Sequence, residues 1–132
     1  MKKRYAVALN YATGLARELA PKLRGGEILA LVGPLGSGKT TFTKALAKEL
    51  GIRKSVTSPT FTIMNRYPLK KIPNCLFLYH LDLYRTNSFP EVEQLGITEV
   101  WATPETVTIL EWADKIQDHL PKKTIFIYFS HT

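Results

Sequence analysis

The sequence has one cysteine, few turn-forming residues and no long apolar run, and each scarcity excludes a class of protein. Cys75, the single cysteine among 132 residues, cannot close an intramolecular disulfide or supply a cysteine-rich metal site, which agrees with a reducing compartment. No apolar stretch approaches the roughly 18 residues of a membrane-spanning helix, and the one after the basic start is too short for a signal peptide. We therefore expect a cytoplasmic protein that does not bind a membrane.

Glycine and proline, at eight residues each, are too few for a disordered or fibrous chain. The hydrophobic fraction of 45% and the charged fraction of 22% are close to those of ordinary globular chains. The length suits one domain, since domains most often have about 100 to 150 residues. Composition and length thus predict a single domain, residues 1–132, that folds around one core.

Positive charge is concentrated in the first part of the chain. Residues 1–80 contain 14 basic and 3 acidic side chains, whereas residues 81–132 contain 4 basic and 8 acidic ones. A basic portion of this kind suits phosphate-bearing ligands or an acidic partner. Because the lysines are scattered among several predicted elements and form no compact arginine-rich arm, the charge is only weak evidence for direct nucleic-acid binding.

The hydrophobic pattern predicts an α/β fold. Residues 10–23 have helical spacing with Asn10 as the N-cap, and the apolar run 28–32 suits a strand buried on both faces of a sheet. The other predicted elements are a helix over 40–50 that stops at Gly51, an antiparallel strand pair over 61–67 and 75–81, a short helix over 90–95, a strand over 107–110, a helix over 113–120 and a strand over 124–129. The expected sheet is mixed and mainly parallel, flanked by helices.

Residues 33–40 match the pattern G-x-x-x-x-G-K-[ST] between a buried strand and a helix, and this context identifies a P-loop. Gly36 and Gly38 let backbone N–H groups surround phosphate oxygens, which a Cβ would obstruct. Lys39 would reach the β- and γ-phosphates, and the Thr40 hydroxyl would coordinate Mg²⁺. The predicted nucleotide-binding residues of the loop are Gly36, Ser37, Gly38, Lys39, Thr40 and Thr41. The fold class is therefore a single P-loop NTPase-like domain.

A P-loop nucleotidase also needs a carboxylate that holds Mg²⁺, usually at the end of a neighbouring strand. Asp82 follows the apolar run 75–81, and Glu111 follows the run 107–110. Each carboxylate is a candidate ligand of Mg²⁺. The alternative, which stays open for both, is a solvated charge at a strand end without a function. Three roles stay open for His80: a base, a contact to Mg²⁺-bound water, or a purely structural residue.

Several nucleotide-binding classes lack support in the sequence. It contains no N-K-x-D string for guanine selection, no D-x-x-G after the candidate strand and no L-S-G-G-Q transporter signature. A small-molecule P-loop kinase stays open as the alternative, but such kinases generally use several arginines over the phosphoryl group. After Arg66 this chain has only Arg85. A nucleotide-dependent binding module without turnover is the third hypothesis.

The residues resemble a known family, the bacterial TsaE (YjeE) P-loop ATPases of tRNA threonylcarbamoyladenosine synthesis. The matching segments are Leu-Gly-Ser-Gly-Lys-Thr-Thr-Phe at 35–42, Val-Thr-Ser-Pro-Thr-Phe at 56–61, His-Leu-Asp-Leu-Tyr-Arg at 80–85 and Glu-Trp at 111–112. Many families share the P-loop, whereas the other segments in this order are specific. The similarity is collinear from about residue 13 to 120. The sequence departs from the family pattern at two positions: Pro34 stands where aspartate is common, and Ala113 stands where proline often follows the Glu-Trp pair.

The resemblance implies an ATPase site with ATP and Mg²⁺ as ligands. Lys39 and Glu111 would be catalytic, with Glu111 beside the γ-phosphate. The implied metal ligands are Thr40, Asp82 and Glu111. The implied nucleotide-binding residues outside the P-loop are Thr13, in the N-terminal helix, and Thr60, in a nucleotide-responsive loop.

The resemblance also implies partners, which spacing alone does not reveal. TsaE is expected to join TsaD and TsaB, the enzymes that transfer threonylcarbamoyl to adenosine beside the anticodon in tRNA. ATP hydrolysis by this chain, weak in isolation, would reset that complex between turnovers. Contact with tRNA through the complex and direct contact with this subunit both stay open, and this protein would not itself make the modified base.

Overall fold

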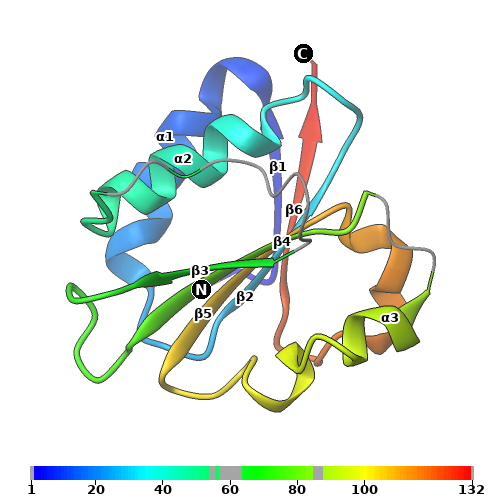
Figure 1. The fold of residues 1–132 in the computed structure, drawn as a ribbon. Coiled ribbons are helices and arrows are strands. Elements are labelled where there is room, and N and C mark those ends of the chain that lie inside the picture. Colours follow the sequence, from blue (N-terminus) through cyan, green and yellow to red (C-terminus); the bar gives the residue numbers. More distant parts are fainter. Residues whose placement is uncertain (1, 54–55, 57–63, 85–87, 132) are drawn as a thin grey trace.

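The computed structural model describes residues 2–53, 56, 64–84 and 88–131. In that part of the chain a single sheet lies between two layers of helices (Figure 1). Thr60 and Arg85 lie outside the described residues, so the nucleotide-responsive role given to Thr60 stays a prediction.

The mixed sheet predicted from the hydrophobic pattern is confirmed. The strands of the described residues are Arg4–Ala8 (β1), Ile28–Val32 (β2), Met64–Pro68 (β3), Phe77–Asp82 (β4), Thr106–Glu111 (β5) and Ile125–Ser130 (β6). Their order across the sheet is β1-β6-β2-β5-β4-β3. β3 runs antiparallel to β4, and the other neighbouring strands are parallel. The carboxyl ends of β2, β5 and β4 therefore meet at one edge of the sheet.

Strand β1 is absent from the sequence-based prediction. It pairs in parallel with β6 at the edge of the sheet, with Arg4 opposite Phe126. Residues 5–9 form a short apolar stretch like the one that identified β2, but only Val7 of β1 is buried, against four of the five residues of β2. Because no glycine bounds this stretch and it runs directly into the predicted helix, its pattern did not identify a strand. Every residue of β5 is buried, which is why that strand is recognisable from a short continuous apolar stretch.

Helices cover both faces of the sheet. The α-helices of the described residues are Ala12–Leu19 (α1), Lys39–Glu49 (α2) and Phe89–Glu93 (α3). Shorter 3-10 segments span Leu9–Tyr11, Ala20–Lys22, Ile97–Glu99 and Ala113–His119. In Figure 1, α1 and α2 lie side by side over one face, and α3 lies on the other side of the sheet. Among the described residues, no helix is both long and apolar enough to cross a membrane.

The predicted helix over residues 10–23 is too long, and its predicted cap is wrong. Tyr11, not Asn10, is the N-cap of α1, and no side-chain hydrogen bond caps it. The α-helix ends at Leu19 because Pro21 has no N–H to donate and its ring would clash with the carbonyl four residues before it. The chain continues instead as the 3-10 turn Ala20–Lys22, which accommodates proline.

The segment predicted as a helix over residues 113–120 is also different. It forms a 3-10 segment, Ala113–His119, in which Ile116 has a non-helical conformation with φ −127° and ψ 24°. Ile116 is buried against the sheet, so tertiary packing outweighs helix geometry at this point. The short helix predicted over residues 90–95 is found as α3.

The glycine stop of α2 is confirmed. Gly51 has φ +80°, a left-handed conformation that favours glycine. Its N–H donates to the Lys48 carbonyl at 3.0 Å, and the N–H of Ile52 donates to the Ala47 carbonyl at 3.0 Å. This pair of bonds is a Schellman motif, which satisfies carbonyls left free at the end of the helix.

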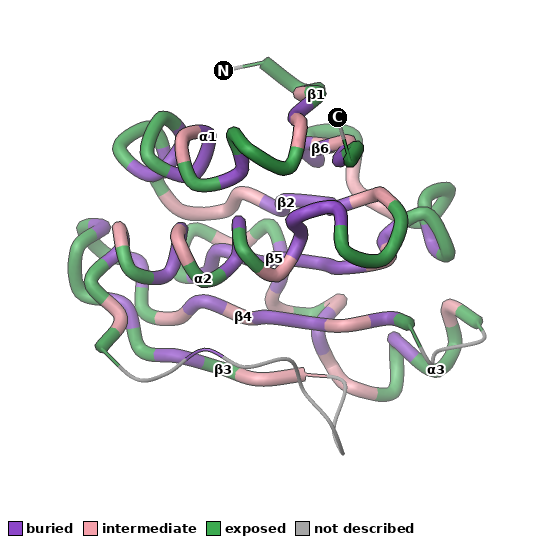
Figure 2. Tube along the Cα trace, turned by 90° about the horizontal axis from the view of Figure 1, so that it is seen from above, coloured by how far each residue is buried: buried purple, intermediate pink, exposed green. Residues whose placement is uncertain are grey.

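The interior holds the P-loop helix firmly against the sheet. Figure 2 shows buried residues along the middle strands and on the inner sides of the helices. Phe42 of α2 is fully buried and meets the ring of Phe129 edge to face, with ring centroids 5.7 Å apart. Because α2 starts at Lys39, this contact also fixes the position of the loop that precedes it.

Candidate nucleotide-binding site

A cavity of about 270 Å³ lies where β2, β4 and β5 end and α2 begins. It is lined by Leu9, Leu35, Gly36, Ser37, Gly38, Lys39, Thr40, Thr41, Asp82, Tyr84, Glu111 and Trp112. The structure thus brings together the P-loop residues and both strand-end carboxylates singled out in the sequence. Ligands of α/β proteins commonly bind in this place, beyond the carboxyl ends of the strands.

The P-loop backbone has the conformation that a phosphate-binding loop requires. Gly38, the residue before α2, has φ +106°. A Cβ at this position would lie 3.2 Å from Leu9 Cδ1 and 3.3 Å from Ala12 Cβ. A Cβ on Gly33 would lie only 2.7 Å from the carbonyl oxygen of Phe129. Side chains are thereby excluded where the loop approaches the sheet and the N-terminal helix.

The amino end of α2 faces the same cavity. Among the described residues no side chain caps this end, so the first N–H groups of the helix are available to an anion. Ser37 is buried, and its hydroxyl donates to the Pro34 carbonyl at 2.6 Å, which fixes the loop internally. Loop and helix end together fit a phosphate group.

Lys39 is held at the base of the loop. Its side chain is only 5% exposed, and its ammonium donates to the carbonyls of Gly33 and Pro34. The ammonium also lies 3.7 Å from the centre of the Trp112 ring. Burial lowers the pKa of Lys39 below its ordinary value, and the nearby carboxylates, chiefly Glu111, act against this shift. The result is a cation enclosed by protein beside the P-loop.

Glu111 is a buried carboxylate fixed from two sides. Its side chain lies at the end of β5, and the residue is 3% exposed. Oε1 accepts a long hydrogen bond of 3.5 Å from the Thr40 hydroxyl, and Oε2 lies 2.6 Å from Nε2 of His80. Because a carboxylate only accepts, we assign the proton of this bond to Nε2. Nδ1 of His80 has no partner among the described residues.

Asp82 lies beside Glu111 because their strands pair in parallel. The two residues are in register across β4 and β5. One oxygen of Asp82 accepts a hydrogen bond of 3.0 Å from the backbone N–H of Tyr84, which turns the carboxylate toward the cavity end of the strand. In the described part of the chain, no group of three or more His, Cys, Asp or Glu side chains forms a cluster that could hold a metal.

The donor set nevertheless fits Mg²⁺ bound together with a nucleotide. Mg²⁺ usually takes one or two protein oxygens and completes its shell with phosphate oxygens and water. The Thr40 hydroxyl and the Asp82 carboxylate line the cavity and are donors of this kind. A complete protein cage is therefore not required here.

Tyr84 and Trp112 are aromatic residues of the site that sequence reasoning missed. Their ring centroids are 5.1 Å apart, and both line the cavity. Trp112 has φ +60°, a strained conformation for a bulky residue, and it places its ring over Lys39. Their position one or two residues after strand-end carboxylates was the available signal, since residues there emerge at the same edge as Asp82 and Glu111.

Among the predicted site residues that the structure describes, Thr13 is the one that does not line this cavity. It is exposed on α1 and lines a separate small cavity with Arg17, Ala45, Lys48 and Glu49. Its neighbour Ala12 does approach the loop at Gly38. The role of Thr13 toward a nucleotide therefore stays a prediction.

The chain is similar to known proteins in both sequence and structure. The family model described as "Threonylcarbamoyl adenosine biosynthesis protein TsaE" matches residues 8–132. The "tRNA threonylcarbamoyladenosine biosynthesis protein TsaE" of Bacillus subtilis is 42% identical over 113 residues, which cover 86% of this chain and 67% of that protein. The protein of the same name from Synechocystis is 41% identical over 111 residues, covering 82% of this chain and 68% of the relative.

A solved structure agrees with the sequence comparison. The crystal structure of Bacillus subtilis YdiB superposes with a TM-score of 0.62 at 35% identity and covers 88% of this chain and 67% of that chain. The chain thus spans about two thirds of the length of these relatives. Since the family model matches nearly all of the chain and the Bacillus subtilis and Synechocystis proteins are more than 40% identical to it, the chain belongs to the TsaE family.

Proposed function

We propose that this chain is a Mg²⁺-dependent ATPase subunit that acts with TsaD and TsaB in the biosynthesis of threonylcarbamoyladenosine in tRNA. The names of its relatives support the pathway. The observation that carries the chemistry is the meeting of Lys39, Thr40, Asp82 and Glu111 in one cavity at the start of α2. A P-loop, a hydroxyl and strand-end carboxylates in this arrangement suit phosphoryl chemistry.

In the proposed site the loop binds and orients the nucleotide. The N–H groups of the P-loop and of the first turn of α2 would donate to phosphate oxygens, and Lys39 would add a positive charge. Lys39 would exchange its loop carbonyl partners for phosphate oxygens. Thr40 and Asp82 would hold Mg²⁺, which when bound neutralises negative charge on the phosphates.

Glu111 is the proposed group that positions and polarises the attacking water. Its carboxylate is enclosed by protein and keeps a fixed orientation between Thr40 and His80. A fixed acceptor in a buried setting can orient a water hydroxyl and accept its proton. His80, which donates to the far oxygen of this carboxylate, is a positioning residue in the proposal.

Replacing His80 with leucine is expected to lower kcat for ATP hydrolysis by about tenfold with little change in KM. The substitution leaves Oε2 of Glu111 without its donor, and an unpaired buried acceptor costs about 1 to 3 kcal/mol. His80→Gln keeps an N–H donor and should recover most of the rate. Steady-state phosphate release at varied ATP measures both constants. A glutamine variant as slow as the leucine variant would assign His80 to packing alone.

The proposed function predicts that the partners stimulate hydrolysis. Phosphate release would be measured for this chain alone, then with TsaD and TsaB, each with and without tRNA. We expect slow release alone and faster release with the partner pair, because a partner can add a cation or order a loop at a P-loop site. Equal rates in all mixtures would contradict partner activation. ATP-dependent phosphorylation of a small metabolite would instead favour a kinase.

A further inference from the structure

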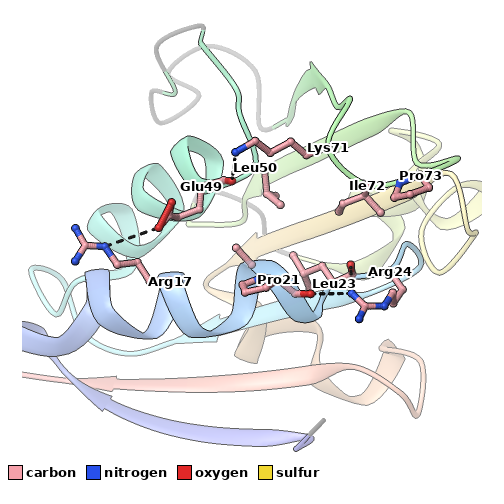
Figure 3. Close-up of a pocket in the computed structure, with 10 residues that line it drawn as sticks. Arg17, Pro21, Leu23, Arg24, Glu49, Leu50, Lys71, Ile72 and Pro73 are labelled. Carbon is pink, nitrogen blue, oxygen red and sulfur yellow. Dashed lines mark hydrogen bonds and ion pairs between the residues drawn. The ribbon is translucent and has the colours of Figure 1, made fainter.

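Adjoining clefts lie at the end of α2 that is farthest from the P-loop. One has a volume of about 560 Å³ and lies between α1 with its following turn, the end of α2 and the loop between β3 and β4 (Figure 3). The other has a volume of about 980 Å³ and shares Leu50 and Lys71 with the first. Of the proposed ATPase residues that the structure describes, none lines either cleft.

Basic side chains dominate the walls of these clefts. We define the basic face by the lysines and arginines that line them: Arg17, Arg24, Lys48, Arg53, Lys70 and Lys71. All of them are exposed. Glu49 is the only acidic residue among the described residues that line the clefts. Folding thus gathers on these adjoining clefts six basic residues that are scattered over residues 17–71 of the sequence.

The contacts of these side chains leave most of their charge uncompensated. Arg17 lies 3.8 Å from Glu49, which is the only ion pair of the basic face within the described residues. Arg24 donates to the Pro21 carbonyl at 2.7 Å, and Lys71 donates to the Glu49 carbonyl at 3.2 Å, as Figure 3 shows. Carbonyl contacts orient a cation without neutralising it, so the face stays attractive to anions.

We propose that the basic face binds the phosphate backbone of RNA. Exposed cations spread over adjoining clefts suit a chain of phosphates, because each lysine or arginine can neutralise a different phosphate. A single small anion would instead require cations that converge on one enclosed point. The choice of tRNA as the RNA rests on the proposed function, whereas the phosphate chemistry rests on the clefts alone.

RNA on this face would leave the ATPase cavity open. The 11 residues of α2 separate the two sites, which at about 1.5 Å per residue is roughly 16 Å along the helix. The nucleotide would bind at the amino end of α2 and the RNA at its carboxyl end. The P-loop cavity and the clefts share no lining residue, so the two sites do not overlap.

The test compares charge reversal on and off the basic face. The variant on the face is Lys70→Glu with Lys71→Glu, and the matched control is Lys122→Glu with Lys123→Glu, an exposed pair that lines neither cleft. Binding of fluorescently labelled tRNA would be followed by anisotropy between 50 and 200 mM KCl. If thermal unfolding shows that the first variant is unstable, a second variant on the face, Lys48→Glu with Arg53→Glu, replaces it.

We expect the face variant to bind tRNA at least tenfold more weakly than wild type at low salt, and the control to bind much more tightly than the face variant. The slope of log K against log salt should become shallower by roughly 1.5, as expected for the loss of two phosphate contacts. Equal weakening in both variants, or no tRNA binding by the wild type, would overturn the proposal. Loss of binding to TsaD and TsaB with tRNA binding intact would overturn it in favour of an acidic protein partner.

The ATP-dependent rise in unfolding temperature is measured on the same samples. It should be unchanged in the face variant, because Lys70 and Lys71 lie away from the P-loop cavity. In the wild type, a normal response to ATP with no tRNA binding would reject the RNA site and leave the proposed ATPase intact. The reverse result would reject the ATPase and leave the RNA site standing.

Discussion

Replacing Glu111 with glutamine is expected to lower the rate of ATP hydrolysis by about 10²- to 10⁴-fold, the usual contribution of a positioned acid or base. Glutamine has nearly the same shape and keeps an oxygen that can accept from Thr40 or His80, so the buried site should stay packed. The amide cannot accept a proton from water as the carboxylate does. Single-turnover phosphate release, with TsaD and TsaB present, measures the loss.

ATP binding by the Glu111→Gln variant should be close to that of wild type, because the phosphates are held mainly by the loop. The variant Asp82→Asn provides the contrast, since loss of a metal ligand should raise the Mg²⁺ concentration needed for half-maximal hydrolysis. If Glu111→Gln weakened ATP binding as much as removal of Lys39 does, the proposed division of labour between the two carboxylates would be wrong.

Lys39→Ala is expected to abolish the stabilisation that ATP and Mg²⁺ confer. A ligand at 100 times its Kd stabilises the folded state by about 2.7 kcal/mol, so wild type should unfold at a clearly higher temperature with the nucleotide. Without the ammonium, the phosphates lose a positive charge that is enclosed by protein. Thermal unfolding with and without ATP·Mg²⁺ measures the difference.

The matched control for Lys39→Ala is Lys44→Ala, an exposed lysine of the same helix. The control should respond to ATP like wild type. Without nucleotide, the free energy of unfolding of Lys39→Ala should be within about 1 kcal/mol of the wild-type value. The reason is that the Lys39 ammonium donates hydrogen bonds to loop carbonyls and is not part of the apolar core. An undiminished nucleotide response in Lys39→Ala would remove this residue from the site.

Elements with a strong local signal were predictable from the sequence. The apolar run of β2, the glycines of the P-loop and the stop of α2 at Gly51 are each encoded by adjacent residues, and the structure contains all of them. Their physical basis is short in range: burial on both faces, positive φ at glycine and helix hydrogen bonds.

Elements that depend on distant residues were predicted less well. β1 is stabilised by pairing with β6 at the other end of the chain, and only one of its own side chains, that of Val7, is buried. Ile116 departs from helical geometry because it packs into the core beneath the sheet. In both cases the deciding contacts lie outside the window in which periodicity can be recognised.

For the candidate site, the sequence by itself determined the chemical groups: a glycine-rich loop with Lys39 and Thr40, and carboxylates at the ends of two apolar runs. The tertiary structure decided how those groups meet. Parallel pairing of β4 with β5 sets Asp82 in register with Glu111 and brings His80 against the buried carboxylate. The packing of α1, the end of α2 and the loop between β3 and β4 gathers distant lysines and arginines on the basic face. Local spacing encodes which atoms are available, but only the non-local packing of strands and helices decides the distances between them.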